Sequence, residues 1–202
     1  SEPWKIPDTA DLPEIDPAFA EGPNAGDEFL PYLRDERGAR PWAIPGTPGL
    51  QHRLGGLEKE NGSGNISYDP ANHALMTELR AQKLEKLAED MPELEVDADE
   101  GAELLVLGWG STYGVIQAAA RRVREREIPI ATAHLRSLDP LPLNAGEVVR
   151  AFPKVLVPEV NTGQLLGMIR GRFLVDAVGY NKMEGLPIFA EELEGAILEV
   201  LA

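Results

Sequence analysis

Histidine, arginine and glutamate side chains gather in a glycine-rich stretch between positions 52 and 73. The run His52-Arg53-Leu54-Gly55-Gly56-Leu57-Glu58-Lys59 is followed by Asn65-Ile66-Ser67-Tyr68-Asp69-Pro70-Ala71-Asn72-His73. Local strand or helix formation does not explain this mixture of glycines, charged groups and imidazoles. Two interpretations stay open: a loop that spaces its flanking segments, or a lid or interface loop. The second would place His52, Arg53, Glu58 or His73 near an active site built elsewhere.

A second motif joins an apolar run to a small-residue turn. Leu104–Leu107 has no polar alternation, which is typical of a strand covered on both faces of a parallel sheet. Gly108 and Gly110 allow a tight turn, and Ser111 or Thr112 could cap a helix that starts there. Backbone N–H groups at such a helix start can hold an anion. The spacing is not GxGxxG and no P-loop lysine is present, so a plain strand-to-helix turn is favoured over a phosphate or carboxylate contact.

Polar side chains also follow the other expected strands. Ligands bind beyond the carboxyl ends of parallel strands, where four loops meet. The polar residues expected to share that edge with Ser111 and Thr112 are Arg136, Glu159, Asn161 and Lys182. Such an edge could be a small-anion site, a subunit interface or simple solvent exposure, and an interface is favoured.

No pattern of residues predicts catalysis by this chain itself. The histidines are His52, His73 and His134, and neither HxxxH nor HExxH spacing occurs, so no metal site is expected. His134 lies in an expected strand and is predicted to be a hydrogen-bonded core residue. No serine sits in a GxSxG elbow. We therefore assign no catalytic residue.

Composition restricts the possible partners and location. The 202 residues include 34 Asp and Glu against 19 Lys and Arg, a net charge of −15, which argues against nucleic acid and anionic membranes as partners. The absence of cysteine excludes disulfides and any iron–sulfur cluster ligated from within this chain. No apolar stretch approaches the about 20 residues that span a bilayer, and no signal peptide opens the sequence. A cytoplasmic protein is expected, and the lack of an initiator methionine suggests a fragment.

The chain is expected to have three regions. Residues 1–68 are rich in proline and glycine, which forbid long helices, yet carry scattered aromatic side chains that disordered linkers lack. They predict an extended arm with a Gly-rich loop, anchored on another surface by Trp4, Phe19, Phe29, Tyr32 and Trp42. Residues 69–100 predict a linking helix, capped by Asp69 and ended by Pro92, and an exposed acidic connector.

Residues 101–202 alternate strands with helices. The expected strands are Leu104–Leu107, Ile130–Leu135, Val155–Val157 and Leu174–Val178, and Asn144 with Glu147 resembles a capping box. Repeated strand–helix units predict an α/β domain with three α/β/α layers and a mainly parallel sheet.

Several motifs occur in one order that resembles the C-terminal part of the α subunit of 2-oxoacid:ferredoxin oxidoreductases, most closely the 2-oxoglutarate type. They are Ala39–Gly46, His52–Lys59, Gly64–His73, Gly108–Gly114 and Val157–Leu165. The resemblance covers nearly the whole chain. It implies a transketolase-C-terminal-like domain, in agreement with the alternation of strands and helices.

The resemblance also implies a reaction. Enzymes of this family oxidatively decarboxylate a 2-oxoacid with coenzyme A, use thiamine diphosphate, magnesium and iron–sulfur clusters, and pass electrons to ferredoxin. The implied partners are the remaining α-subunit domains and a β subunit, assembled as a dimer of heterodimers. The family's pyrimidine-binding domain, with its Tyr-Pro-Ile-Thr-Pro motif, is missing from these residues, so no catalytic residue is carried over. A smaller departure is Glu127, at a turn that favours glycine.

The expected function is therefore a structural and interface module of the α subunit, inactive alone and binding none of these cofactors alone. The first alternative is a stand-alone α/β domain that binds a phosphate-bearing ligand at the Ser111–Thr112 helix start. The second is an assembly protein with no link to catalysis.

Overall fold

The computed structural model describes residues 6–15 and 17–202, so Trp4 lies outside the described residues. The chain forms two compact units that divide between Lys83 and Leu84, within helix α1 (Pro70–Leu87). In this division α1 up to Lys83 belongs with the arm, and the expected boundaries at 68/69 and 100/101 stay a prediction. The two units are described separately.

The second unit contains a five-stranded sheet with the order β1-β3-β2-β4-β5. Strands β2 (Leu104–Trp109), β3 (Ala131–Leu135), β4 (Lys154–Glu159) and β5 (Val178–Asn181) run parallel. Strand β2 lies in the centre, and its residues from Leu104 to Gly108 are all buried, as its apolar sequence predicts. Strand β1 (Val96–Ala98) pairs with β3 in the antiparallel direction.

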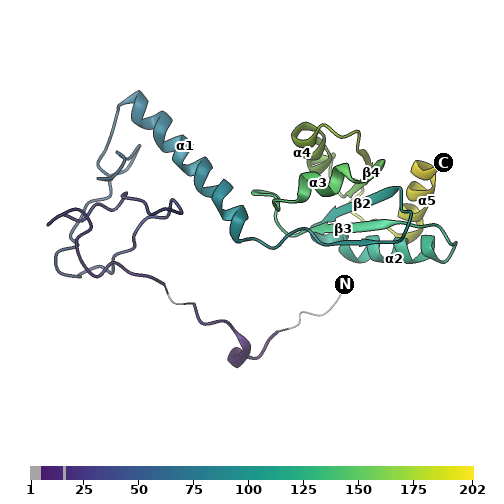
Figure 1. Cartoon of the computed structure of the whole chain (residues 1–202), viewed down its shortest axis with the longest axis horizontal. Helices are drawn as coiled ribbons and strands as arrows, with labels where there is room; N and C mark the ends of the chain where they lie inside the picture. Colours follow the sequence, from purple (N-terminus) through teal and green to yellow (C-terminus); the bar gives the residue numbers. More distant parts are fainter. Residues whose placement is uncertain (1–5, 16) are drawn as a thin grey trace. The chain divides into compact units, whose positions relative to one another are not determined.

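Helices cover both faces of this sheet (Figure 1). Helices α2 (Tyr113–Arg124) and α5 (Ala190–Leu201) pack on the face that carries Leu104 and Val106. Helices α3 (Ala145–Arg150) and α4 (Gln164–Phe173) accompany the opposite face, which carries Leu105 and Leu107. Alternate β2 side chains thus enter two separate cores, and the predicted three-layer α/β/α architecture is confirmed.

Three local expectations were wrong. The last strand does not include Leu174, which ends α4 in the left-handed conformation at φ 54° and is 89% exposed; β5 starts only at Val178. The acidic connector is not merely a link, because it contains β1. Asn144 does not cap α3 with its side chain.

The Asn144 side chain instead ties the connector to the sheet unit. Its Nδ2 donates to the carbonyl of Leu94 at 3.0 Å, and its Oδ1 accepts from the Leu94 N–H at 2.8 Å. Because both ends of the amide are engaged by Leu94, the side chain is not available to cap α3. Sequence spacing shows only the local alternative.

Glu127 lies at the predicted turn between α2 and β3. Its φ of 62° is in the left-handed region that glycine adopts without strain. The unusual choice of glutamate there is therefore a real local cost, as the sequence indicates.

An ion-pair network joins α2 to α5. Glu194 is 5% exposed, and its carboxylate lies 2.5 Å from Arg122 Nε and 2.5 Å from Arg126 Nη2. The hydrogen bond from Arg122 is the main cause that holds the pKa of Glu194 below its ordinary 4.5, with the Arg126 charge adding to it. The network therefore joins α2 to α5 through a carboxylate whose charged form is favoured.

Replacing Glu194 with glutamine should flatten the acid dependence of stability. A carboxyl with a lowered pKa in the folded state stabilises the fold above its ordinary pKa, and this contribution is lost as pH falls through the lowered value. We expect Glu194→Gln to melt at a lower temperature than the parent at pH 7, and the gap to close below pH 4.5. Thermal melts followed by circular dichroism across pH test this, and parallel curves for the two proteins would contradict it.

The first unit has little regular structure beyond the helix. The arm contains a 3-10 turn, η1 (Thr9–Asp11), and isolated bridges such as Phe19 with Trp42 and Tyr32 with Gly62. Phe29 and Leu50 are buried, at 4% and 3% exposure. The predicted cap of α1 is confirmed, since the Asp69 carboxylate accepts from the Ala71 N–H at 3.0 Å.

Helix α1 ends before the residue expected from the sequence. A 3-10 turn, η2 (Ala88–Asp90), follows Leu87, so the α-helix stops four residues before Met91. Another 3-10 turn, η3 (Gly110–Thr112), precedes α2. No helix in the described part of the chain is long and apolar enough to cross a membrane.

Candidate functional site: a basic pocket in the first unit

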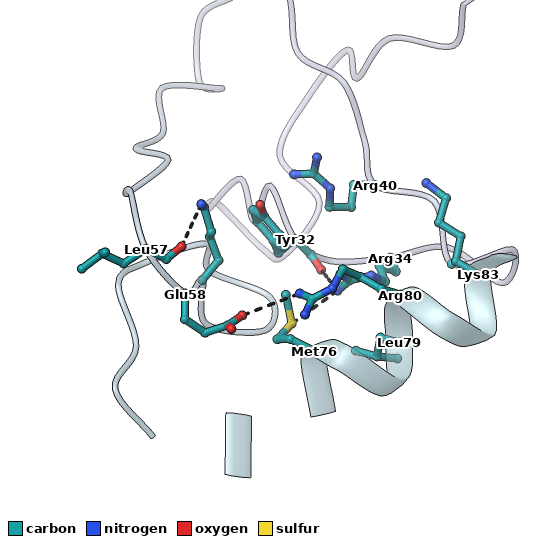
Figure 2. Close-up of a pocket in the computed structure, with 11 residues that line it drawn as sticks. Tyr32, Arg34, Arg40, Leu57, Glu58, Met76, Leu79, Arg80 and Lys83 are labelled. Atoms are coloured by element: carbon teal, nitrogen blue, oxygen red, sulfur yellow. Dashed lines mark hydrogen bonds and ion pairs between the residues drawn. The ribbon is translucent and has the colours of Figure 1, made fainter. Parts of the chain in front are cut away.

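The arm, the Gly-rich loop and α1 enclose a pocket of about 450 Å³ (Figure 2). All its lining residues belong to the first unit. The apolar part of the wall comes from Tyr32, Leu57, Met76 and Leu79. A volume of this size suits a small ligand rather than a single ion.

Basic side chains form the rest of the wall, namely Arg34, Arg40, Lys59, Arg80 and Lys83. A single acidic side chain, Glu58, accompanies them. In a chain whose net charge is −15, this local excess of positive charge is unexpected. It defines the basic pocket as the candidate site.

Arg34 lies at the back of the basic pocket and is half-buried. Its Nη1 donates to the Tyr32 carbonyl at 3.4 Å and to Asn61 Oδ1 at 3.2 Å, both neutral acceptors. Partial burial lowers the pKa of Arg34, and the positive charges of Arg40 and Arg80 lower it further. The guanidinium therefore lies among like charges.

Arg40 lies over an aromatic face. Its guanidinium carbon is 4.2 Å from the centroid of the Tyr32 ring, a cation–π contact. Lys83 comes from the last pocket-lining turn of α1, next to Gly38, where an added Cβ would meet Lys83 Cβ at 3.3 Å. Both cations are exposed, so they line the mouth of the pocket.

Glu58 and His73, two residues singled out in the sequence, meet beside the pocket. His73 Nδ1 is 2.5 Å from Glu58 Oε2, and Arg80 Nη1 is 3.7 Å from Glu58 Oε1. The hydrogen bond with His73 is the main cause that lowers the pKa of Glu58, with smaller contributions from the His73 and Arg80 charges. The Glu58 carboxylate thus interacts with both His73 and Arg80.

The other two loop candidates lie apart from this arrangement. His52 packs on Phe29, with ring centroids 5.0 Å apart, and its Nδ1 is 2.7 Å from the Leu50 carbonyl. Arg53 is exposed and does not line the basic pocket. The structure therefore brings together only two of the four residues predicted in this loop.

At the carboxyl edge of the sheet, most predicted polar residues are engaged in structural contacts. Thr112 is 3% exposed and its Oγ1 donates to the Trp109 carbonyl at 2.8 Å, while Ser111 and Arg136 are exposed. Thr112 stands at the start of α2 without capping it through its side chain, which corrects the expected cap. Asn161 Oδ1 accepts from the N–H groups of Gly163 and Gln164 at 2.8 and 3.1 Å.

Glu159 and Lys182 are also engaged in structural contacts. Glu159 is fully buried and accepts hydrogen bonds from the N–H groups of Leu165 and Leu166 at 2.9 and 3.0 Å. Lys182 is 7% exposed and its Nζ lies 2.7 and 2.8 Å from the two carboxylate oxygens of Glu192. These two side chains hold the edge together rather than present charge to a ligand.

His134, expected as a hydrogen-bonded core histidine, has a backbone hydrogen bond with Gly110 but is only partly satisfied. It is half-buried, and its buried Nδ1 has no hydrogen-bond partner in the described part of the chain. Burial lowers the pKa of His134, opposed by a backbone contact at Gly110. The ring makes an edge contact with Tyr113 at 5.1 Å between centroids, so packing determines its position.

The side chains do not fit the metal groups that the family resemblance implies. The 202 residues include no cysteine for an iron–sulfur cluster. Within residues 6–15 and 17–202, no group of three or more His, Asp or Glu residues could hold a metal ion. An iron–sulfur cluster would need cysteine ligands from outside these residues.

The sequence did not predict the basic residues that line this pocket. Arg34, Arg40, Arg80 and Lys83 were not predicted as site residues, although Arg80 and Lys83 stand three apart on one helix face with Met76 and Leu79 nearby. That spacing was the available signal. This spacing indicates a basic site only together with the packing of the arm against α1, which the sequence does not show.

Comparisons with known proteins agree with this architecture. No family model matches the chain. Over its whole length, the chain is 52% identical to 2-oxoglutarate oxidoreductase subunit KorA of Mycobacterium tuberculosis, and it spans 30% of that protein. It is 32% identical over 148 residues to 2-oxoacid:ferredoxin oxidoreductase 1, subunit alpha, of Aeropyrum pernix, a match covering 68% of the chain and 23% of the relative.

A solved structure shows the same fold. A chain of the 2-oxoglutarate:ferredoxin oxidoreductase from Magnetococcus marinus, solved with 2-oxoglutarate, coenzyme A and succinyl-CoA bound, superposes with a TM-score of 0.86 and 31% identity. The match covers 97% of this chain and 34% of that one. The present chain thus spans about a third of the length of these proteins.

These findings define the protein class first: an α/β segment of an oxidoreductase subunit. More particularly, the chain is similar over its whole length to part of the α subunit of a 2-oxoglutarate oxidoreductase, and over 68% of its length to part of the α subunit of a 2-oxoacid:ferredoxin oxidoreductase. The family resemblance in the sequence is confirmed.

Proposed function

We propose that this chain is a structural and interface module of a 2-oxoacid:ferredoxin oxidoreductase that converts 2-oxoglutarate, coenzyme A and oxidised ferredoxin to succinyl-CoA, CO₂ and reduced ferredoxin. The observation that carries the proposal is the exposure of large apolar side chains along the arm. Trp42 is 63% exposed, Ile44 53% and Tyr68 84%. Exposed aromatic anchors of this kind are typical of protein interfaces.

The complete assembly would supply the chemistry. Thiamine diphosphate, magnesium and iron–sulfur clusters would be held by the remaining α-subunit domains and a β subunit, in a dimer of heterodimers located in the cytoplasm. The catalytic steps then belong to residues outside this chain. The 52% identity to the Mycobacterium tuberculosis subunit and the ligands of the Magnetococcus marinus enzyme support this proposal.

Residues of the present chain would contribute surfaces. His52 and Arg53, in the exposed Gly-rich loop, and Ser111, Arg136 and Asn161, at the carboxyl edge of the sheet, are proposed interface positions. Glu58 and His73 flank the basic pocket. A ligand bound by Thr112 would need its hydroxyl, which is already donated to Trp109, so the stand-alone ligand-binding alternative receives no support from this residue.

The isolated chain should be inactive. With 2-oxoglutarate, coenzyme A and an electron-accepting dye, the 202-residue chain is expected to give no reduction above the protein-free rate, because it lacks the residues that position thiamine diphosphate. The complete α subunit with its β subunit is the positive control. Turnover by the isolated chain would overturn the proposal.

The arm should contribute to assembly. In the complete α subunit, Trp42→Ala is expected to raise the dissociation constant between the α and β subunits by at least about 30-fold, as truncation of a buried interface tryptophan does. Leu143→Ala, at an apolar side chain that is 68% exposed in the other unit, is the matched control. Subunit dissociation measured by sedimentation tests this, and equal dissociation constants would contradict it.

A further inference from the structure

The basic pocket concentrates positive charge beyond what folding of the first unit explains. Of the 19 Lys and Arg residues in the chain, five line this one space, against a single carboxylate. Like charges at short range destabilise a fold unless something offsets them. A cluster of this kind is therefore informative about a ligand.

Few of these cations are neutralised within the protein. No ion pair joins Arg34, Arg40 or Lys83 to a carboxylate across residues 6–15 and 17–202. Arg34 contacts a carbonyl and an amide oxygen, and Arg40 contacts the Tyr32 ring. Lys59 donates to the Leu57 carbonyl at 2.9 Å. Only Arg80 faces a carboxylate, and Glu58 is closer to His73 than to Arg80.

The geometry suits an anion with several oxygens. Arginines at the back and the mouth, with lysines beside them, offer many N–H donors around one space, and guanidinium groups match phosphate oxygens in pairs. The apolar wall of Met76, Leu79 and the Tyr32 ring leaves room for an organic group attached to that anion. The volume of about 450 Å³ exceeds what a single phosphate needs.

We propose that the basic pocket binds a phosphoryl anion of diphosphate size, either free or as the phosphate end of a small organic ester. Arg34, Arg40, Arg80 and Lys83 hold its oxygens, and Glu58 limits the affinity because it is the one negative charge in the wall. This site goes beyond the proposed interface function, and its test measures binding alone. Its outcome is therefore separate from the outcome of the turnover assay.

Titration calorimetry of the 202-residue chain with pyrophosphate, and separately with ADP, tests the proposal. We expect saturable binding of one equivalent, weakened as ionic strength rises. Tighter binding of ADP identifies an ester as the better ligand, and equal or weaker binding identifies the free anion. Either result supports a phosphoryl site.

Charge variants locate the site. Arg40→Gln and Lys83→Gln change exposed side chains, and each should weaken pyrophosphate binding about tenfold or more, the effect of one charged hydrogen bond. Glu58→Gln should tighten it several-fold, a gain that loss of folding would not produce. Arg172→Gln, which removes the same charge from the exposed surface of α4, is the matched control and should leave affinity unchanged.

Three results would overturn the proposal. One is no saturable binding of either ligand to a chain whose circular dichroism shows it folded. Another is equal affinity across the Arg40, Lys83, Glu58 and Arg172 variants, which would mean general attraction to the surface. The last is tighter binding of a hexaglutamate peptide than of pyrophosphate, which would assign the pocket to an acidic polypeptide.

Discussion

Glu159→Ala is expected to lower the free energy of unfolding of the second unit by about 3 to 5 kcal/mol. The carboxylate is fully buried and accepts four hydrogen bonds. Two come from the N–H groups of Leu165 and Leu166 in the first turn of α4, one from Trp109 Nε1 at 3.3 Å and one from Asn161 Nδ2 at 3.0 Å. Removing the acceptor leaves these donors without a partner in a buried site and removes negative charge from a helix N-terminus.

Urea denaturation followed by circular dichroism measures this effect. Glu147→Ala, at an exposed glutamate of α3, is the matched control and should change stability by no more than about 0.5 kcal/mol. Glu159→Gln should fall between alanine and the parent, since its amide oxygen accepts while its NH₂ faces another donor. Equal stability of Glu159→Ala and Glu147→Ala would show that water replaces the carboxylate.

Leu107→Ala is expected to cost about 2 to 5 kcal/mol in the same assay. Leu107 is fully buried in the central strand β2, in the core shared with Leu165 and Ile169 of α4. Its truncation removes apolar contacts and leaves a cavity that a strand paired on both sides cannot collapse to fill.

The control for this substitution is Leu143→Ala, at a leucine 68% exposed, which should be nearly neutral. The two variants remove the same atoms, so their difference isolates burial. A cost below about 1 kcal/mol for Leu107→Ala would contradict the central position of β2 in the core.

Long apolar runs were sufficient to predict the sheet. Leu104–Leu107 has no polar alternation, which is typical of a strand buried on both faces, and the alternation of strands with helices favoured parallel crossovers. The strand at Leu174 was wrong because a residue in the left-handed conformation and an exposed turn intervene before β5, and apolar composition does not encode that backbone angle.

The candidate site could be predicted only in part. The Gly-rich loop was recognised as unusual, and Glu58 with His73 do meet at the basic pocket. Its cations come from the arm and from α1, at positions separated by up to 49 residues, from Arg34 to Lys83. Their proximity depends on irregular backbone that has no periodicity to reveal it.

The amino-acid sequence by itself determined the α/β architecture and the lack of cysteine ligands, because these follow from local periodicity and composition, and the order of its motifs resembles that of the oxidoreductase α subunits. Only the tertiary structure decided which polar side chains are buried in structural contacts and which are accessible to a ligand. Glu159, Thr112 and Lys182 are buried and stabilise the fold through their contacts. The folded arm brings its basic side chains next to those of α1, around one pocket. Contacts between residues far apart in the chain arise from tertiary packing, and local sequence patterns do not predict them.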